Sequence, residues 1–172
     1  MRVVVWVVAI ALAGVLGWWY WRIHPDPAMP DGAQPVVVRS IQDGDTMEVT
    51  ALGPGRVVAT AVPVGVRLLG VDAPETNPMQ CWAEKAKADL TDLAPPGSRI
   101  WVIGDEEEVD DSGRRLLYAW TLDGVFVNAR LAESGSARLI AAPPNLRYKM
   151  EISKKVDEAR RTRRGLWGAC TN

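Results

Sequence analysis

The feature that most limits the fold of this chain is an uninterrupted uncharged segment near its N-terminus. Residues 3–21 carry no charged side chain and are flanked by Arg2 and Arg22. As a helix, this segment would be about 28 Å long, close to the roughly 30 Å hydrocarbon core of a bilayer. It has no polar face, and aromatic residues crowd its C-terminal end, as in the interfacial belt of a membrane span. We therefore expect residues 3–21 to form a transmembrane anchor, with a cleaved signal peptide as the alternative.

The rest of the chain has the composition of one modest globular domain. Residues 22–35 are rich in proline and predict a stiff linker, so we expect the folded domain to span residues 36–172. The chain of 172 residues is 48% hydrophobic and 24% charged, which is typical of a packed core. Its formal net charge of −1 excludes binding to nucleic acid or acidic lipid through bulk charge and leaves only a local patch. The single histidine, His24, argues against a histidine-rich metal centre in this domain.

Hydrophobic patterning predicts short strands first and helices among the later strands. Residues 46–51 alternate between apolar and polar side chains, which indicates a half-buried strand. The expected strands cover residues 36–41, 46–51, 56–62, 64–71, 99–103 and 116–122, and the expected helices cover residues 82–93, 125–134 and 148–159. Five or so short, curved strands with these helices predict an α+β domain built on a small barrel.

Three charged fragments stand at the expected strand ends. They are Asp43-Gly44-Asp45-Thr46, the segment from Arg67 to Thr76 that contains Asp72-Ala73-Pro74-Glu75, and Asp111-Ser112-Gly113-Arg114. Each fragment alone is a weak signal, because such residues often only form turns or cap helices. Their order along the chain, followed by Gly124-Val125-Phe126-Val127-Asn128, is far more specific.

This order resembles that of the staphylococcal nuclease (thermonuclease) family. The resemblance covers about residues 36–167 and includes the ending Arg164-Gly165-Leu166-Trp167. It implies an OB-fold, a five-stranded β-barrel with three helices, which would here be preceded by one N-terminal transmembrane helix. It also implies a Ca²⁺-dependent phosphodiesterase that cleaves DNA and RNA and leaves 3′-phosphate ends.

The resemblance implies a calcium site made by Asp45, Asp72 and the backbone carbonyl of Ala73. Ala73 stands where the family has threonine, and because the ligand there is the carbonyl oxygen, the site should stay usable. Two carboxylates 4 Å apart repel by roughly 4 kcal/mol at an effective dielectric constant near 20, so they surround a phosphate only with a cation between them. Carboxylate, carbonyl and water oxygens suit a hard ion such as Ca²⁺.

The resemblance assigns the catalytic roles to Arg67, Glu75 and Arg114. Glu75 matches the carboxylate that handles the attacking water, and it follows Asp72 by three residues, close enough to hold a water beside the metal. Arg67 and Arg114 match two phosphate-binding guanidinium groups. Such groups stay charged at any working pH and stabilise the charge that develops on the phosphoryl oxygens.

The two cysteines, Cys81 and Cys170, bear on the compartment of the protein. Their placement resembles that in a subset of extracytoplasmic bacterial family members. We expect the two cysteines to pair, and two unrelated buried thiols are the alternative. A disulfide would indicate an oxidising compartment. Because Arg2 and Arg22 give no clear charge bias, the cysteines decide the expected orientation. We expect a monomeric single-pass membrane protein whose domain lies outside the cytoplasm, or a secreted protein if the segment is cleaved.

Three segments depart from the family pattern. Residues 105–111 contain six acidic side chains and form either a solvated loop or a segment that repels substrate or binds a cation weakly. Residues 141–144 fall where the archetype has tyrosines, so we expect weaker base stacking there. Residues 147–164 carry a surplus of five positive charges, which is either a solvated helix face or a patch that tracks a nucleic-acid backbone. Three tryptophans, Trp101, Trp120 and Trp167, are expected to lie in the core of the domain.

Two other functions fit part of the sequence. An OB-fold also binds nucleic acid without cleaving it, so a non-catalytic, membrane-tethered binding module is the main alternative. Such a module has no need for three carboxylates and two arginines in this order. The third candidate is an envelope protein in which calcium and the disulfide are only structural, and it predicts no loss of single-stranded DNA when metal is supplied.

Overall fold

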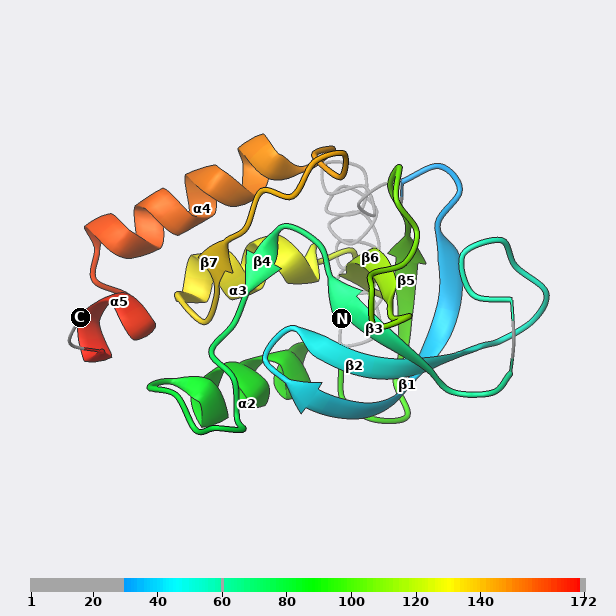
Figure 1. The fold of residues 1–172 in the computed structure, drawn as a ribbon, viewed down its shortest axis with the longest axis horizontal. Coiled ribbons are helices and arrows are strands. Elements are labelled where there is room, and N and C mark those ends of the chain that lie inside the picture. The colour runs from blue at the N-terminus through cyan, green and yellow to red at the C-terminus, as the bar shows by residue number, and fades with distance from the viewer. Residues whose placement is uncertain (1–29, 60, 171–172) are drawn as a thin grey trace, which may run out of the picture.

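A computed structural model describes residues 30–59 and 61–170 of the protein (Figure 1). The expected transmembrane segment, residues 3–21, and most of the expected linker lie outside the described residues. Among the residues that are described, no helix has both the length and the apolar character needed to cross a membrane.

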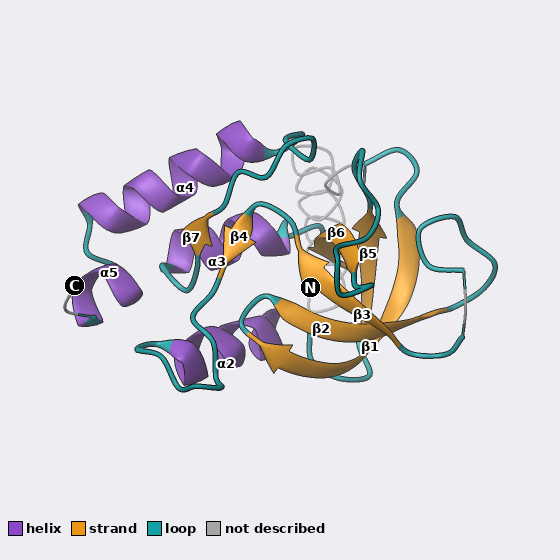
Figure 2. Ribbon diagram, viewed as in Figure 1, coloured by secondary structure: helices purple, strands orange, loops and turns teal. Residues whose placement is uncertain are grey.

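Five strands form a closed barrel in the order β1-β2-β3-β6-β5, which confirms the expected barrel. The strands are β1 (Gln34–Asp43), β2 (Thr46–Ala51), β3 (Val64–Leu68), β5 (Arg99–Ile103) and β6 (Arg115–Thr121). Neighbouring strands are antiparallel except β3 and β6, which run parallel and close the barrel. Figure 2 shows this barrel on one side of the molecule and most of the helical structure on the other.

Alternating side chains fill the inside of the barrel. Val36 and Val38 of β1, Met47 and Val49 of β2, and Val66 of β3 are all fully buried. A five-stranded barrel is narrow enough for such side chains to fill it completely. Burying each valine contributes ~1.5–3 kcal/mol relative to leaving it in water. The period-2 pattern in the sequence is therefore what closes the barrel and fixes which side chains of each strand point outward.

Four helices and a two-stranded sheet form the side of the described structure that lies next to the barrel (Figure 2). The helices are α2 (Ala83–Leu93), α3 (Val127–Ser134), α4 (Lys149–Arg161) and α5 (Leu166–Ala169), and the small sheet pairs β4 (Val71–Asp72) with β7 (Arg138–Leu139). The apolar faces of α2 and α4 are buried through Ala86, Leu90, Ile152 and Val156. The first three helices confirm the expected ones, whereas α5 is too short for a periodic pattern to reveal it.

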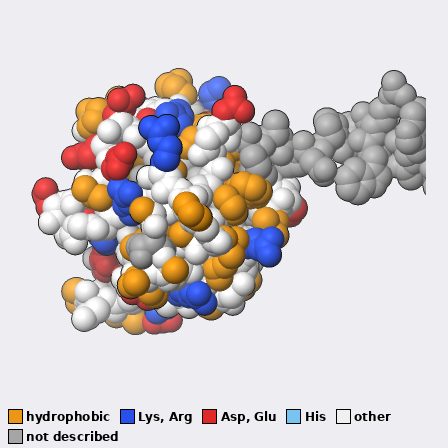
Figure 3. Space-filling model, turned by 90° about the vertical axis from the view of Figure 1, so that its right-hand side faces the viewer, with side chains coloured by type: hydrophobic (Ala, Val, Ile, Leu, Met, Phe, Trp, Pro, Cys, Tyr) orange, Lys and Arg blue, Asp and Glu red, His pale blue; other side chains and the backbone are white. Residues whose placement is uncertain are grey.

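Two expected strands differ from the structure. Residues 56–59 and 61–62 form no strand in the described structure, because β2 pairs with residues 64–67 of β3 and leaves them no ladder partner. The expected strand 64–71 stops at Leu68, because Gly70 has a φ of +77°, which ends the extended conformation. Leu52 and Val62 are 48% and 66% exposed, and the face that carries the connection between β2 and β3 shows hydrophobic side chains among charged ones (Figure 3).

The domain begins slightly earlier than the sequence predicts. β1 starts at Gln34, inside the expected linker, and Gln34 and Pro35 pair with Val102 and Trp101 of β5. The side-chain amide of Gln34 also donates a hydrogen bond to the carbonyl of Val58, at 2.7 Å. These contacts make residues 34 and 35 part of the barrel.

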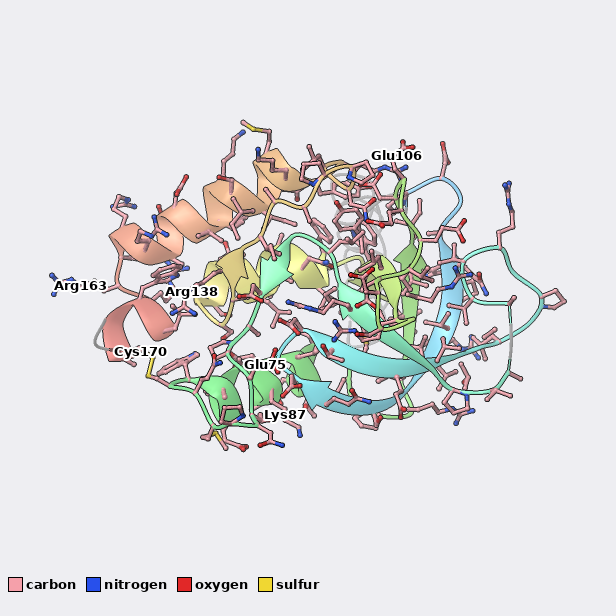
Figure 4. All side chains as sticks on the ribbon, in the orientation of Figure 1. Glu75, Lys87, Glu106, Arg138, Arg163 and Cys170 are labelled. Carbon is pink, nitrogen blue, oxygen red and sulfur yellow. A yellow bond between two sulfur atoms is a disulfide. The ribbon has the colours of Figure 1, made fainter. Side chains whose placement is uncertain are left out.

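Cys81 and Cys170 form a disulfide, with their Cα atoms 5.9 Å apart. The bond joins the segment just before α2 to the residue that follows α5, near Cys170 in Figure 4. It closes a loop across 89 positions of the sequence and connects the segment after β4 to the C-terminal end of the domain.

We expect the double variant Cys81→Ser, Cys170→Ser to lower the free energy of unfolding by about 2–4 kcal/mol, because the unfolded chain regains the freedom that the closed loop removes. Urea unfolding of the full chain in a mild non-ionic detergent measures this change. An unfolding free energy equal to that of the unmodified chain would contradict this structural role of the disulfide.

Candidate active site

Asp45 is a buried carboxylate in the turn between β1 and β2. Its side chain is 2% exposed, and its Oδ2 atom accepts a hydrogen bond from the amide of Ala73 at 2.5 Å. Its Oδ1 atom accepts one from the hydroxyl of Thr46 at 3.0 Å. Gly44 makes this packing feasible, because a Cβ atom there would lie 2.6 Å from the Cβ atom of Ala86 and 2.8 Å from that of Ala73. The turn therefore presses Asp45 against the segment that follows β4.

Arg67 bridges the two carboxylates that the sequence places in the metal site. Its Nη1 atom lies 2.5 Å from Oδ2 of Asp45, and its Nη2 atom lies 2.8 Å from Oδ1 of Asp72. Nη1 also donates to the carbonyl of Val71 at 3.1 Å. Arg67 is positioned by β3, which pairs it with Thr46 of β2, one residue after Asp45. One guanidinium group thus joins the β1–β2 turn, β3 and β4.

Glu75 lies in the electrostatic field of the same cluster. It is exposed, and its pKa is raised by partial burial and by the neighbouring charges of Asp43 and Asp45, against which Arg67 acts. In Figure 4, Glu75 is drawn between the β1–β2 turn and α2. Asp43 holds Thr76, the residue that follows Glu75, because its Oδ1 atom accepts hydrogen bonds from both the amide and the hydroxyl of Thr76. The structure therefore places Glu75 within electrostatic reach of Asp45 and Asp72.

The cluster has more negative than positive charge. Two carboxylates, those of Asp45 and Asp72, are paired with the guanidinium group of Arg67, and the charges of Asp43 and Glu75 act on the same region. The pKa of Asp45 is raised, mainly by burial, although Arg67 opposes this shift. Within the described parts of the chain, no three acidic, histidine or cysteine side chains converge as a complete set of metal ligands.

The donor chemistry of the cluster nevertheless fits a hard cation. Asp45 and Asp72 supply carboxylate oxygens, and the side chain of Asp72 is 46% exposed and open to solvent. Ala73 is adjacent, although the contact it makes with Asp45 uses its amide and not its carbonyl. A cation here would relieve the excess of negative charge, and oxygen ligands of this kind suit Ca²⁺.

Arg114 lies outside the carboxylate cluster. It precedes β6, beside β3, and its Cγ atom is 3.3 Å from the position that a Cβ atom at Gly65 would occupy, two residues from Arg67. Its Nε atom lies 2.7 Å from Oδ2 of Asp110. No ion pair joins it to Asp45 or Asp72 in the described part of the structure. The barrel therefore places Arg114 next to the strand of Arg67 but directs its guanidinium group to Asp110.

Comparison with known proteins identifies the family. The family model described as “Staphylococcal nuclease homologue” matches residues 65–169. A thermonuclease of Staphylococcus intermedius is 33% identical over 135 residues, which cover 76% of this chain and 74% of that protein. A thermonuclease of Staphylococcus hyicus is 31% identical over 135 residues, which cover 76% of this chain and 73% of that protein. The chain belongs to the staphylococcal nuclease family.

A third relative places the same domain in a longer protein. Endonuclease YhcR of Bacillus subtilis (strain 168) is 28% identical over 156 residues, which cover 84% of this chain but 12% of that protein. The family resemblance drawn from the order of the charged fragments is confirmed by these matches.

In this staphylococcal nuclease homologue, the acidic segment 105–111 is neither a purely solvated loop nor a free cation site. Glu108 pairs with Arg115 at 2.8 Å, Asp110 with Arg114 at 2.7 Å, and Asp105 with Arg147 at 3.6 Å. Asp110 also accepts hydrogen bonds from the amides of Ser112 and Arg114. The segment therefore forms a turn whose carboxylates pair with arginines. One of these arginines is Arg114, a candidate phosphate-binding residue, which Asp110 restrains.

Sequence reasoning missed Asp43 and Asp110. Asp43 stands in the same Asp-Gly-Asp-Thr fragment as Asp45, and Thr76 directly follows Glu75. If the two fragments meet at one site, these two residues also come close together, as their hydrogen bond shows. The pairing of Asp110 with Arg114 spans four residues, which is within the reach of a turn. Of the expected core tryptophans, Trp120 is buried and stacks on Phe126 at 4.6 Å between ring centroids, whereas Trp101 and Trp167 are half-buried.

Tyr118 lies beneath the acidic segment. It is 1% exposed, and its hydroxyl lies 3.3 Å from Oδ2 of Asp105. Burial, followed by the charge of Asp105, raises the pKa of Tyr118 from 10.0 to about 12. Because the folded protein holds this proton more tightly than the unfolded chain, the corresponding stability is complete below pH 10 and is lost as the pH rises to about 12.

We expect the free energy of unfolding to decrease between pH 10 and about 12, and to decrease less steeply in Tyr118→Phe, which keeps the ring but has no ionisable proton. Urea unfolding at a series of pH values measures both slopes. Equal slopes in the two proteins would show that Tyr118 does not couple its ionisation to folding.

Proposed function

We propose that this protein is a calcium-dependent nuclease that hydrolyses phosphodiester bonds of DNA and RNA and leaves 3′-phosphate ends. The family match and the thermonuclease relatives support a nuclease, which is a phosphodiesterase with nucleic acid as its substrate. The observation that carries the proposal is the bridge that Arg67 makes between Asp45 and Asp72. The bridge supports the proposal because it joins a candidate phosphate-binding arginine to two candidate metal ligands, one of which, Asp72, is 46% exposed.

Asp45, Asp72 and the carbonyl of Ala73 would hold the Ca²⁺ ion, which supplies charge neutralisation and polarises a phosphoryl oxygen. Arg67 carries a planar, permanently charged fork that suits the oxygens of a phosphate as well as those of a carboxylate. Its side chain is 15% exposed, so part of it is accessible to a substrate. Arg67 would orient the phosphate and stabilise the negative charge that develops on it.

Arg114 would supply the second guanidinium group. Its side chain is 37% exposed and is restrained by a partly exposed ion pair with Asp110. Because ion pairs that are open to solvent contribute about 0–1 kcal/mol, a phosphodiester, whose single negative charge is shared by two oxygens, could replace the Asp110 carboxylate as its partner. Glu75, exposed beside the cluster, would hold the attacking water and accept its proton.

The non-catalytic binding module remains the second candidate function. Its weakness is electrostatic, because a protein that only binds a polyanion gains nothing from two carboxylates paired with Arg67 and further negative charge from Glu75. A reaction that uses a cation and a base would account for the gathering of these side chains at Arg67.

We also propose that residues 3–21 anchor the protein in a membrane, that the domain faces outside the cytoplasm, and that it acts as a monomer. The uncharged run of this segment supports the anchor. The Cys81–Cys170 disulfide supports an oxidising compartment, since cytoplasmic thiols stay reduced. If the segment is cleaved, the same domain would be secreted.

We expect the full chain, kept in non-ionic detergent, to degrade single-stranded DNA and RNA when Ca²⁺ is supplied and to lose this activity in excess chelator. Labelling of the 3′ ends with and without prior phosphatase treatment identifies the termini. Ends that carry the expected 3′-phosphate accept the label only after the phosphatase has removed it. Equal degradation with and without chelator would contradict the calcium requirement, and 3′-hydroxyl ends would contradict the proposed bond.

We expect Arg67→Ala, Glu75→Ala and Arg114→Ala each to lower turnover on single-stranded DNA by about a hundredfold or more, as for groups that act in the transition state. Arg99→Ala, which removes an exposed arginine at the start of β5, is the matched control and should keep full activity. Circular dichroism checks that each variant is folded. Near-full turnover in a folded Arg67, Glu75 or Arg114 variant would remove that residue from the mechanism.

A further inference from the structure

Two arginines from distant parts of the chain converge on one tryptophan, away from the carboxylate cluster. The guanidinium carbon of Arg160, on α4, lies 4.5 Å from the ring centroid of Trp167, on α5. The guanidinium carbon of Arg138, on β7, lies 5.7 Å from the same centroid. Figure 4 shows Arg138 in the region between β7, α4 and α5. Cation–π attraction to the indole face holds both cations at this position.

Neither cation is neutralised in the described structure. Arg138 and Arg160 are exposed, and no ion pair to a carboxylate is formed by either of them among the described residues. Neighbouring arginines behave differently, because Arg161 pairs with Glu158 at 2.6 Å and Arg164 reaches the same carboxylate at 4.0 Å. Two like charges near one ring, without a counterion, create a local positive potential that attracts an anion.

The small sheet connects this cation pair to the carboxylate cluster. Arg138 of β7 is the register partner of Asp72 of β4, and Asp72 is bonded to Arg67. The cation pair therefore begins one strand away from the place where a scissile phosphate would bind. A nucleic acid is a chain of phosphates, so a strand that enters the cluster presents its next phosphates to the neighbouring surface.

We propose that Arg138 and Arg160, positioned by Trp167, form a second binding site for the phosphodiester backbone of a single strand. The site takes the nucleotides that adjoin the one being cleaved. Its place in catalysis rests on the proposed function, whereas its affinity for a polyanion does not. Part of the basic surplus of residues 147–164 is then a backbone-tracking surface.

The test measures binding without cleavage. The full chain in non-ionic detergent and excess chelator is titrated into a fluorescein-labelled oligothymidylate of about twelve nucleotides, at several salt concentrations, and followed by fluorescence anisotropy. The variant is Arg138→Met, Arg160→Met, which removes both charges but keeps long side chains to pack on Trp167. The control is Lys149→Met, Lys154→Met, which removes two exposed lysines of the same helix and changes the net charge equally.

We expect the arginine variant to bind about tenfold more weakly and to lower the slope of log affinity against log salt by about 1.4, since each lost phosphate contact on a single strand contributes about 0.7. The lysine control should keep the slope of the unmodified chain.

Two results would overturn the inference. If the arginine variant shifts only the urea midpoint and keeps the affinity and the salt slope, the arginines serve packing alone. If the lysine control loses as much affinity as the arginine variant, bulk charge explains binding. A failure of the proposed nuclease function has a different signature: no cleavage with Ca²⁺, while binding still depends on Arg138 and Arg160.

Discussion

The candidate site depends on the ion pair between Arg67 and the buried carboxylate of Asp45. A carboxylate removed from water is costly unless it is paired and hydrogen-bonded. Asp45 meets this need with Arg67, the amide of Ala73 and the hydroxyl of Thr46. Because these partners come from separate elements, the electrostatic requirement of one side chain joins the β1–β2 turn, β3 and the segment after β4. The arginine that would bind substrate is therefore also the residue that assembles the site.

The barrel and the helical side contribute differently to this site. The barrel fixes Arg67 on β3 and pairs it with Thr46, the residue that follows Asp45, which limits the movement of both charged side chains. Asp72 lies on β4, and Glu75 lies on the connection between β4 and α2, where Asp43 holds Thr76 and the disulfide fixes Cys81. The barrel thus presents the charged pair, while β4 and a tethered connection present Asp72 and Glu75 to it.

The sequence predicts the parts of the fold that local patterns encode. Alternation in residues 46–51 and helical spacing in residues 82–93 identify β2 and α2, because each pattern needs only its own segment. The valine-rich residues 56–62 misled the prediction, because a strand also needs a partner, and β2 pairs with β3 instead. The two-residue strands β4 and β7 carry no pattern at all, although their pairing places Arg138 beside Asp72.

For the site, the residue types were predictable but the contacts were not. The fragments around Asp45, Asp72 and Glu75 could be assigned from their order along the chain, and the structure brings them together. The partner of Arg114 could not be assigned in this way, because the acidic segment offers several carboxylates and only the geometry of the turn selects Asp110. Arg114 is therefore the candidate residue whose position in the structure differs most from its expected role.

Calcium-dependent stability tests the central claim most directly, because it needs no turnover. A cation bound by Asp45 and Asp72 stabilises the folded state by about 2.7 kcal/mol at a hundred times its dissociation constant. We predict that Ca²⁺ raises the midpoint of thermal unfolding of the full chain, and that Asp72→Asn, a change at a partly exposed side chain, removes most of this rise. An unchanged midpoint in the unmodified chain, or an equal rise in Asp72→Asn, would contradict the assignment of this cluster as the calcium site.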